Sequence, residues 1–239
     1  MSTFIISDLH LEESRPDITE IFFKFLKNEV MSAKALYILG DFFESWIGDD
    51  DDTTFHRSII KALKQVSEKH IPVYFMPGNR DFLIGRRFLK ASGCQRLPDE
   101  YIIDLNGLPT LMMHGDTLCT QDIKYLKFRK KARHWFFQKL FLLKSLKNRR
   151  ALAQQYRDVS RNHTQHLPDY VMDVTPAAVE AVMRKHQATH LIHGHTHRQA
   201  VHQFLLNEKK VTRTVLGAWH DHGNALLCKD NGSTQFILL

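Results

Sequence analysis

Side chains that can bind metal ions recur in five short clusters along the 239-residue chain. Each cluster follows an apolar run, and the clusters read Asp-x-His, Gly-Asp, Gly-Asn, His-Gly and Gly-His-Thr-His. Oxygen and imidazole donors without thiolate suit Mn²⁺, Fe²⁺ or Zn²⁺. The candidate ligands exceed the needs of one ion and suit two; they are Asp8, His10, Asp41, Asn79, His114, His195 and His197.

A pair of ions needs a bridging ligand, and a carboxylate can bridge because it has two oxygens. Asp41 is the candidate for this bridge. Two ions about 3.5–4 Å apart can hold the attacking and leaving oxygens of a phosphoryl displacement, and they acidify the attacking water. The expected chemistry is hydrolysis at phosphorus, for which no protein nucleophile is required.

The cluster HGHTH places histidines at alternate positions, from His193 to His197. If this segment is extended, alternate side chains point the same way, so His195 and His197 can reach two adjacent ions. Gly194 would allow the backbone to come close to the site. His193 either supports a ligand or packs in the core. A lone histidine near a strand is more often structural than a ligand, so the metal prediction depends on all five clusters occurring in order.

Short apolar runs predict the elements that position these clusters. Runs of this length, bounded by glycine or polar residues, indicate buried strands. They lie at residues 4–6, 36–39, 73–76, 111–113, 191–192 and 215–216. Helical spacing of apolar residues occurs at 19–28 and 55–69. Strands that alternate with helices predict an α/β fold, in which ligands gather at the carboxyl ends of the strands.

Composition excludes several classes of protein. A hydrophobic content of 43% is enough for a core, so disorder is not expected. The three cysteines show no paired spacing, which indicates a reducing compartment. We recognise no signal peptide and no run of about 18 apolar residues. A single domain over residues 1–239 is expected, either cytosolic or bound peripherally to the cytosolic face of a membrane.

The net charge of +7 is concentrated in one segment. Residues 123–157 carry 12 Lys or Arg and no Asp or Glu. Aromatic and leucine side chains are interleaved with them, and Phe136, Leu140 and Leu143 would lie on one face of a helix. Such a helix can lie at an anionic membrane surface, cover acyl chains as a lid, or simply pack on the domain. The run Asp49–Asp52 is expected to be a solvated acidic loop rather than a metal site.

In this order, the five clusters resemble the motifs of the calcineurin-like metallophosphoesterases, which read D-x-H, G-D, G-N-H-[DE], H and G-H-x-H. The resemblance covers nearly the whole chain. It implies a four-layer α/β/β/α sandwich of two packed sheets, and an inserted helical lid is expected at about residues 122–168. One ion would be held by Asp8, His10, Asp41 and His197. The other would be held by Asp41, Asn79, His114 and His195.

The third cluster departs from that pattern at Arg80, where most of the superfamily has a histidine that protonates the leaving group. Arginine cannot donate a proton near neutral pH, but it can hold phosphate with a planar, bidentate fork. A leaving group that needs no proton is therefore favoured. A phosphate monoester is such a group, so the departure points to a pyrophosphate substrate.

The stretches GNRDF, ALYILGDFFESWIGDDD, HGDTLCT, LIHGHTHR and VLGAWH resemble the UDP-2,3-diacylglucosamine pyrophosphohydrolases of lipid A biosynthesis. The resemblance implies water attack on the α-phosphorus of UDP-2,3-diacylglucosamine, usually with two Mn²⁺ ions, giving UMP and 2,3-diacylglucosamine 1-phosphate. It implies a peripheral location on the cytoplasmic side of the inner membrane. The implied catalytic residues are Asp41, Asn79, Arg80 and His195.

The same resemblance implies substrate contacts from Asn79, Arg80, Asp122, Ser160, Thr164 and His195. The family's lid tends to carry Ser, Asn and Lys at i, i+4 and i+7. This chain keeps Ser160 but has Thr164 and Leu167 at the next two positions. Thr164 retains a hydroxyl without the amide, and Leu167 lacks the positive charge.

Two alternatives remain open from the sequence. A nuclease or nucleotide phosphodiesterase could use the basic segment to follow a phosphate backbone, with aromatic side chains stacking on bases. Arg80 counts against it, because a ribose leaving oxygen needs a proton. The second alternative is a metal-bearing scaffold without activity, but such scaffolds tend to lose ligands and this chain keeps all seven. We expect an enzyme that binds no nucleic acid and needs no obligate protein partner.

Overall fold

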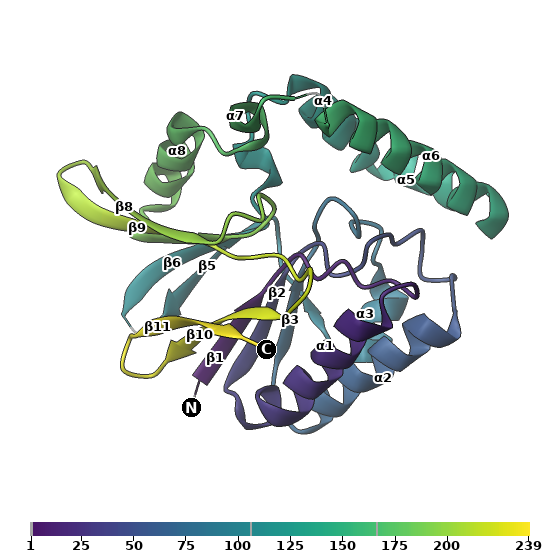
Figure 1. Ribbon diagram of the computed structural model, residues 1–239, viewed down its shortest axis with the longest axis horizontal. Helices are drawn as coiled ribbons and strands as arrows, with labels where there is room; N and C mark the ends of the chain where they lie inside the picture. The colour runs from purple at the N-terminus through teal and green to yellow at the C-terminus, as the bar shows by residue number, and fades with distance from the viewer. Residues whose placement is uncertain (1, 106, 166) are drawn as a thin grey trace.

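Two β-sheets packed face to face form the centre of the computed structural model, and helices cover their outer faces (Figure 1). The structure describes residues 2–105, 107–165 and 167–239, apart from the side chains of Thr164 and Asp169. The first sheet has six strands in the order β11-β10-β1-β2-β3-β4. Strands β1 to β4 are parallel, and β10 and β11 extend the sheet antiparallel beside β1. Their bounds are β1 Ser2–Ile6, β2 Ala35–Leu39, β3 Val73–Met76, β4 Gln95–Arg96, β10 Asn224–Lys229 and β11 Thr234–Leu238.

The second sheet has five strands in the order β5-β6-β7-β9-β8. Its three central strands are parallel, and β5 and β8 pair antiparallel at the two edges. The bounds are β5 Glu100–Leu105, β6 Leu108–Met113, β7 His190–His193, β8 Ala200–Leu206 and β9 Lys209–Val215. The parallel strands of both sheets are the ones that the apolar runs predict.

Side chains alternate between the two faces of each strand, and this alternation separates two cores. Phe4 and Ile6 of β1 belong to the core under α1 (Pro16–Asn28), α2 (Thr54–Glu68) and α3 (Arg86–Ser92). Ile5 belongs to the other core, which includes strands of both sheets and α8 (Pro176–His186). The layers are therefore helices, sheet, sheet, helix, and the predicted α/β/β/α sandwich is confirmed.

The carboxyl ends of β1, β2, β3, β6 and β7 carry the metal-binding clusters. The first three strands are neighbours in one sheet, and β6 and β7 are neighbours in the other. Each cluster starts within three residues of the end of its strand. Because these ends meet at one edge of the sandwich, the fold brings the five clusters together.

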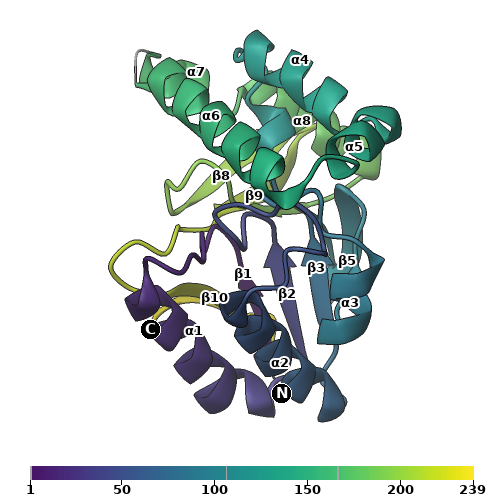
Figure 2. The same ribbon diagram turned by 90° about the vertical axis from the view of Figure 1, so that its right-hand side faces the viewer.

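Four helices lie between β6 and α8 in the sequence: α4 (Ile123–Ala132), α5 (Trp135–Leu142), α6 (Leu146–Thr164) and α7 (Asp169–Met172). Figure 2 shows α4, α5 and α6 gathered at one end of the molecule, away from α1 and α2. The expectation of Phe136, Leu140 and Leu143 on one helix face is wrong, because α5 ends at Leu142. Ser145 begins a new helix by accepting a hydrogen bond from the Asn148 amide. Among the described residues, no helix has the length and hydropathy needed to cross a membrane.

Candidate metal centre

The backbone turns sharply at most of the predicted ligands. Asp8, His10, Asp41, His195 and His197 all have positive φ angles, between 49° and 68°. Such left-handed conformations are unfavourable for residues with a side chain and cluster at functional sites. The expectation that HGHTH is extended is therefore wrong: β7 ends at His193, and the two later histidines reach the site from a turn.

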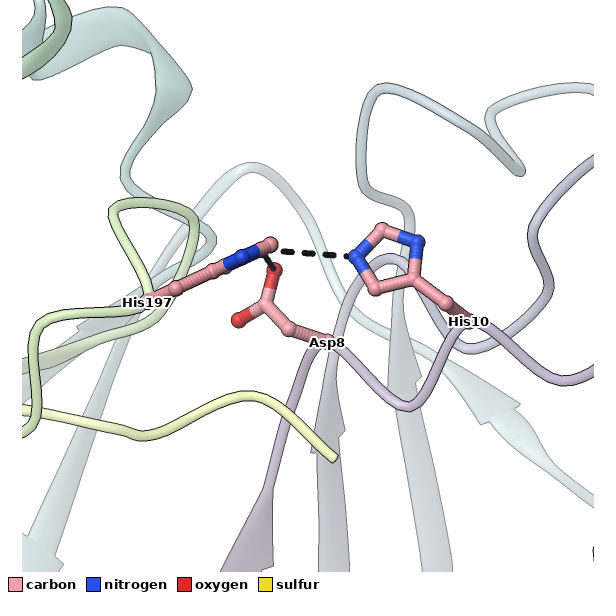
Figure 3. A group of neighbouring side chains, drawn as sticks. All are labelled: Asp8, His10 and His197. Carbon is pink, nitrogen blue, oxygen red and sulfur yellow. Dashed lines mark hydrogen bonds and ion pairs between the residues drawn. The ribbon is translucent and has the colours of Figure 1, made fainter. Parts of the chain in front are cut away.

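The first group of converging donors contains Asp8, His10 and His197 (Figure 3). The Nε2 atoms of His10 and His197 lie 3.4 Å apart, and His197 Nε2 lies 3.4 Å from Asp8 Oδ1. Asp8 is fully buried, and its Oδ1 has no hydrogen-bond partner. A buried carboxylate oxygen without a donor, facing two imidazole nitrogens, fits a bound cation.

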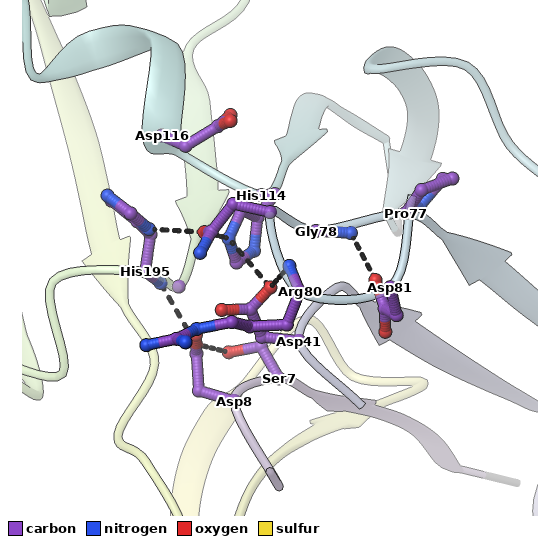
Figure 4. Close-up of polar contacts among 12 residues, drawn as sticks. Ser7, Asp8, Asp41, Pro77, Gly78, Arg80, Asp81, His114, Asp116 and His195 are labelled. Atoms are coloured by element: carbon purple, nitrogen blue, oxygen red, sulfur yellow. Dashed lines mark hydrogen bonds and ion pairs between the residues drawn. The ribbon is translucent and has the colours of Figure 1, made fainter. Parts of the chain in front are cut away.

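The second group brings Asp8 and Asp41 to His114, with Asn79 and His195 beside them (Figure 4). His114 Nδ1 lies 2.8 Å from the Leu39 carbonyl oxygen, so Nδ1 donates and Nε2 presents a lone pair to the site. Asn79 Oδ1 lies 2.8 Å from this Nε2 and 3.0 Å from His195 Nδ1. Lone pairs that face one another at these distances are compatible with a cation between them.

Asp41 faces both groups of donors. Its Oδ1 lies 3.6 Å from His114 Nε2, and its Oδ2 lies 3.9 Å from His10 Nε2. This arrangement suits the bridging role expected for Asp41. The structure adds that Asp8 also belongs to both groups.

Two glycines make room for these carboxylates. A Cβ atom on Gly194 would lie 2.2 Å from Asp8 Oδ2 and from Ser7 Oγ. A Cβ atom on Gly78 would lie 2.2 Å from Asp41 Oδ1. Side chains at these positions would displace the carboxylates, so the close backbone approach expected at Gly194 is present.

Electrostatics tune the first group. Burial raises the pKa of Asp8, but a hydrogen bond with His197 and the charges of nearby histidines lower it well below its usual range. Burial lowers the pKa of His10, but a hydrogen bond with Glu44 and the charges of Asp41 and Asp8 raise it to about 9. Strong perturbation of neighbouring groups is typical of functional sites.

Supporting residues around the ligands were not predicted from the sequence. Glu44 Oε2 lies 2.9 Å from His10 Nδ1 and orients this imidazole. Asp81 is fully buried and accepts hydrogen bonds from the amides of Gly78 and Phe42 at 2.7 and 2.8 Å. Burial and the charge of Asp41 raise the pKa of Asp81 to about 6. Both residues lie within stretches that carry the family resemblance, which was the available signal.

The predicted substrate residues occupy different places. The Arg80 amide donates to Asp41 Oδ1 at 2.9 Å, and its guanidinium lies 3.6 Å from Glu44 Oε1. Asp122 caps α4 by accepting from the Tyr125 amide at 2.9 Å. Ser160 lies exposed on α6, and the side chain of Thr164 is outside the described residues.

His193 packs in the core, with its Nδ1 2.9 Å from the carbonyl oxygen of Gly194. Burial lowers the pKa of His193 to about 3, so the ring is neutral.

The acidic run Asp49–Asp52 is not a solvated loop, contrary to expectation. Asp49 accepts hydrogen bonds from the amides of Gly85, Arg87 and Phe88 at 2.9–3.1 Å and caps α3. Asp51 is buried and paired with Arg150. Charged partners and backbone donors replace water because the run lies under α6.

Comparison with known proteins identifies the family. Residues 1–199 match the family model described as calcineurin-like phosphoesterase. The chain belongs to the calcineurin-like phosphoesterases. A curated relative from Serratia proteamaculans, named UDP-2,3-diacylglucosamine hydrolase, is 48% identical over 95% of this chain and 94% of its own length. A relative of the same name from Azotobacter vinelandii is 48% identical over 97% and 96%.

A solved structure of an archaeal phosphodiesterase shares the fold of this phosphoesterase. It has a TM-score of 0.50 and 13% sequence identity, and the match covers all of both chains. This identity is too low to indicate more than the fold. The family membership and the two groups of donors together support binding of divalent metal ions.

Proposed function

We propose that this phosphoesterase hydrolyses the pyrophosphate bond of UDP-2,3-diacylglucosamine in lipid A biosynthesis. Water would attack the α-phosphorus, giving UMP and 2,3-diacylglucosamine 1-phosphate. The observation that carries the proposal is the convergence of seven oxygen and imidazole donors around an unpartnered oxygen of Asp8. Near-full-length relatives named for this hydrolysis support the choice of substrate.

Two Mn²⁺ ions are proposed as cofactors. One set of ligands would be Asp8, His10, Asp41 and His197, and the other Asp41, Asn79, His114 and His195. When bound, such ions supply Lewis-acid charge to a displacement at phosphorus. The protein's own contribution is to hold the donors in place: Leu39 and Glu44 orient His114 and His10, and the Arg80 amide orients Asp41.

Arg80 is proposed to hold the diphosphate. Its guanidinium lies 3.6 Å from Glu44 Oε1, and that of Arg157 from α6 lies 3.8 Å from the same oxygen. Both distances exceed a good hydrogen bond, so donors of both arginines remain available to phosphate oxygens. No proton donor is required from Arg80, because the leaving group is itself a phosphate monoester.

Helices α4 to α6 are proposed to form the lid at residues 122–168 and to contact the glucosamine through Asp122, Ser160 and Thr164. The exposed apolar side chains of this segment gather on α5. They are Trp135, Phe136, Phe137, Leu140, Leu142 and, just after the helix, Leu143. Apolar side chains among lysines suit the interface of an anionic membrane. We propose that the protein binds peripherally to the cytoplasmic side of the inner membrane, where a diacylated substrate lies.

Binding of nucleic acid is less favoured by the charges of the basic segment. Arg129 and Arg133 pair with Asp99, and Arg149 pairs with Asp50. Arginines committed to carboxylates in the protein contribute little to a phosphate backbone.

A product assay in H₂¹⁸O tests the proposal. Protein stripped of metal and reloaded with Mn²⁺ receives UDP-2,3-diacylglucosamine in detergent micelles. We expect UMP and the lipid monophosphate to be released, the activity to be lost on chelation, and ¹⁸O to enter UMP. Label in the lipid phosphate would place the attack on the β-phosphorus. Cleavage of nucleic acid without cleavage of this substrate would contradict the proposal.

A further inference from the structure

One face of helix α4 carries Tyr125, Arg129 and Arg133 at i, i+4 and i+8. This spacing aligns side chains along one side of a helix. All three side chains are partly buried, whereas Lys127 on the same helix is exposed. Each of the three reaches a different loop beside the metal centre.

Tyr125 covers His195. The two rings are nearly parallel, at 28°, with their centroids 6.1 Å apart. The Tyr125 hydroxyl donates to Asp116 Oδ2 at 2.5 Å, which fixes the ring against the histidine.

Arg129 holds the turn that follows His114. Its Nε donates to Asp116 Oδ2 at 2.5 Å, and a terminal nitrogen donates to Asp99 Oδ2 at 2.8 Å. Asp116 is buried and lies two residues after His114 (Figure 4). A buried ion pair of this kind loses much of its stability when one partner is removed.

Arg133 holds the loop that carries Asn79. One terminal nitrogen donates to Asp99 Oδ1 at 2.8 Å. The other donates to the carbonyl oxygens of Gly78 and Pro77 at 2.8 and 3.2 Å. The planar guanidinium thus joins α4 to the residue immediately before Asn79.

We propose that Tyr125, Arg129 and Arg133 are positioning residues for one of the two ion sites, the one formed by Asn79, His114 and His195 with Asp41. The inference rests on the proposed two-metal function. The remaining ligands are supported from elsewhere, because His10 bonds to Glu44 and Asp8 to Ser7. Docking of α4 and assembly of one ion site are then a single event, and α4 does more than cover the substrate.

Metal titration of the whole chain tests this inference. The variants are Arg133→Met and Tyr125→Phe, with Lys127→Met as the control that removes a charge from the exposed side of α4. Calorimetry and electron paramagnetic resonance follow Mn²⁺ binding to metal-free protein. We expect Arg133→Met to weaken one of the two ions about 10–100-fold, the range found when support of a ligand is lost. Tyr125→Phe, which keeps the ring but loses the bond to Asp116, should weaken the same ion less. The other ion in each variant, and both ions in the control, should bind as in the wild type.

The outcomes separate the inference from the proposed function. Two ions bound to Arg133→Met and Tyr125→Phe with wild-type affinity would overturn the inference and leave the proposed function intact. Equal weakening of both ions would also overturn it, because a general loss of structure would explain that result. If Arg133→Met does not fold, the milder Tyr125→Phe variant decides. A wild-type chain that binds fewer than two ions overturns both proposals.

Discussion

Arg149 and Asp50 fasten helix α6 to the loop that follows β2. The buried guanidinium of Arg149 donates to both carboxylate oxygens of Asp50, to the Ile47 carbonyl oxygen at 2.8 Å and to the Lys144 carbonyl oxygen at 3.0 Å. The corner between α5 and α6 is therefore held by one side chain with four acceptors. This contact connects the basic segment to the acidic run Asp49–Asp52.

The variant Arg149→Met should lower the free energy of unfolding by about 1–3 kcal/mol, because it leaves two carbonyl oxygens without their donor. Lys147→Met, at an exposed position of the same helical turn, should change it by less than about 0.5 kcal/mol. Urea unfolding of both variants measures the difference. Equal stabilities of the two would show that the contact has no net value.

Arg80→Ala should lower kcat about 10²–10³-fold, as expected when a preorganised donor to the reacting group is removed. The melting temperature should change little, because the side chain is partly exposed and only distantly paired. Arg80→Lys keeps the charge without the bidentate fork and should recover part of the rate. Steady-state kinetics with UDP-2,3-diacylglucosamine measure this. Unchanged turnover of Arg80→Ala would remove Arg80 from the active site.

Metal removal should destabilise the protein. An ion that binds only the folded chain adds about 2.7 kcal/mol at a free concentration 100 times its dissociation constant. Thermal unfolding of chelated protein should therefore begin at a lower temperature, and Mn²⁺ should restore the higher one. His197→Gln removes one donor of the first group, so the response to Mn²⁺ should shrink. A melting temperature that ignores both chelator and Mn²⁺ would argue against a metal centre.

Acid should destabilise the protein through His190. This histidine is buried with its Nε2 2.9 Å from Thr214 Oγ1, and burial lowers its pKa. Above the unfolded pKa of about 6.5, both states are neutral and the group has no effect. Below it, the unfolded chain takes up a proton that the folded chain does not, so stability falls by up to about 1.4 kcal/mol per pH unit.

The variant His190→Gln isolates this contribution. Between pH 7 and pH 5.5 it should lose less stability than the wild type, by up to about 1 kcal/mol. Urea unfolding at the two pH values provides the comparison. The same loss in both proteins would mean that His190 titrates alike when folded and unfolded.

Membrane binding should depend on α5. Trp135 and Leu143 are 67% and 75% exposed. Replacing both with Ser should weaken sedimentation with phosphatidylglycerol vesicles by about tenfold or more, since each large apolar side chain contributes about 1.5–3 kcal/mol when fully buried. The control replaces Val201 and Leu205 of β8, which are 54% and 67% exposed, with Ser. Equal losses in both variants would contradict a specific role of α5.

The predicted strands and the missed ones differ in how they are buried. The strands β1, β2, β3, β6 and β7 were predicted because continuous apolar runs end in glycine or polar residues. The edge strands β5, β8 and β11 were missed, since their faces are largely exposed and carry no apolar run. The same limit applies to the basic segment, where helix ends at Ala132 and Leu142 depend on local caps rather than on hydrophobic spacing.

The sequence by itself determined the chemical types of the candidate ligands and their order, because each cluster follows its own apolar strand. The tertiary structure decided which donors face one another. His10 and His197 are 187 positions apart and meet only when the two sheets pack. It also decided the supporting contacts of Glu44, Asp99 and Arg133, because charge pairs between distant segments leave no periodic signal in the chain. The turn at His195 and His197 depends on that packing as well, since a left-handed backbone persists only where surrounding contacts hold it.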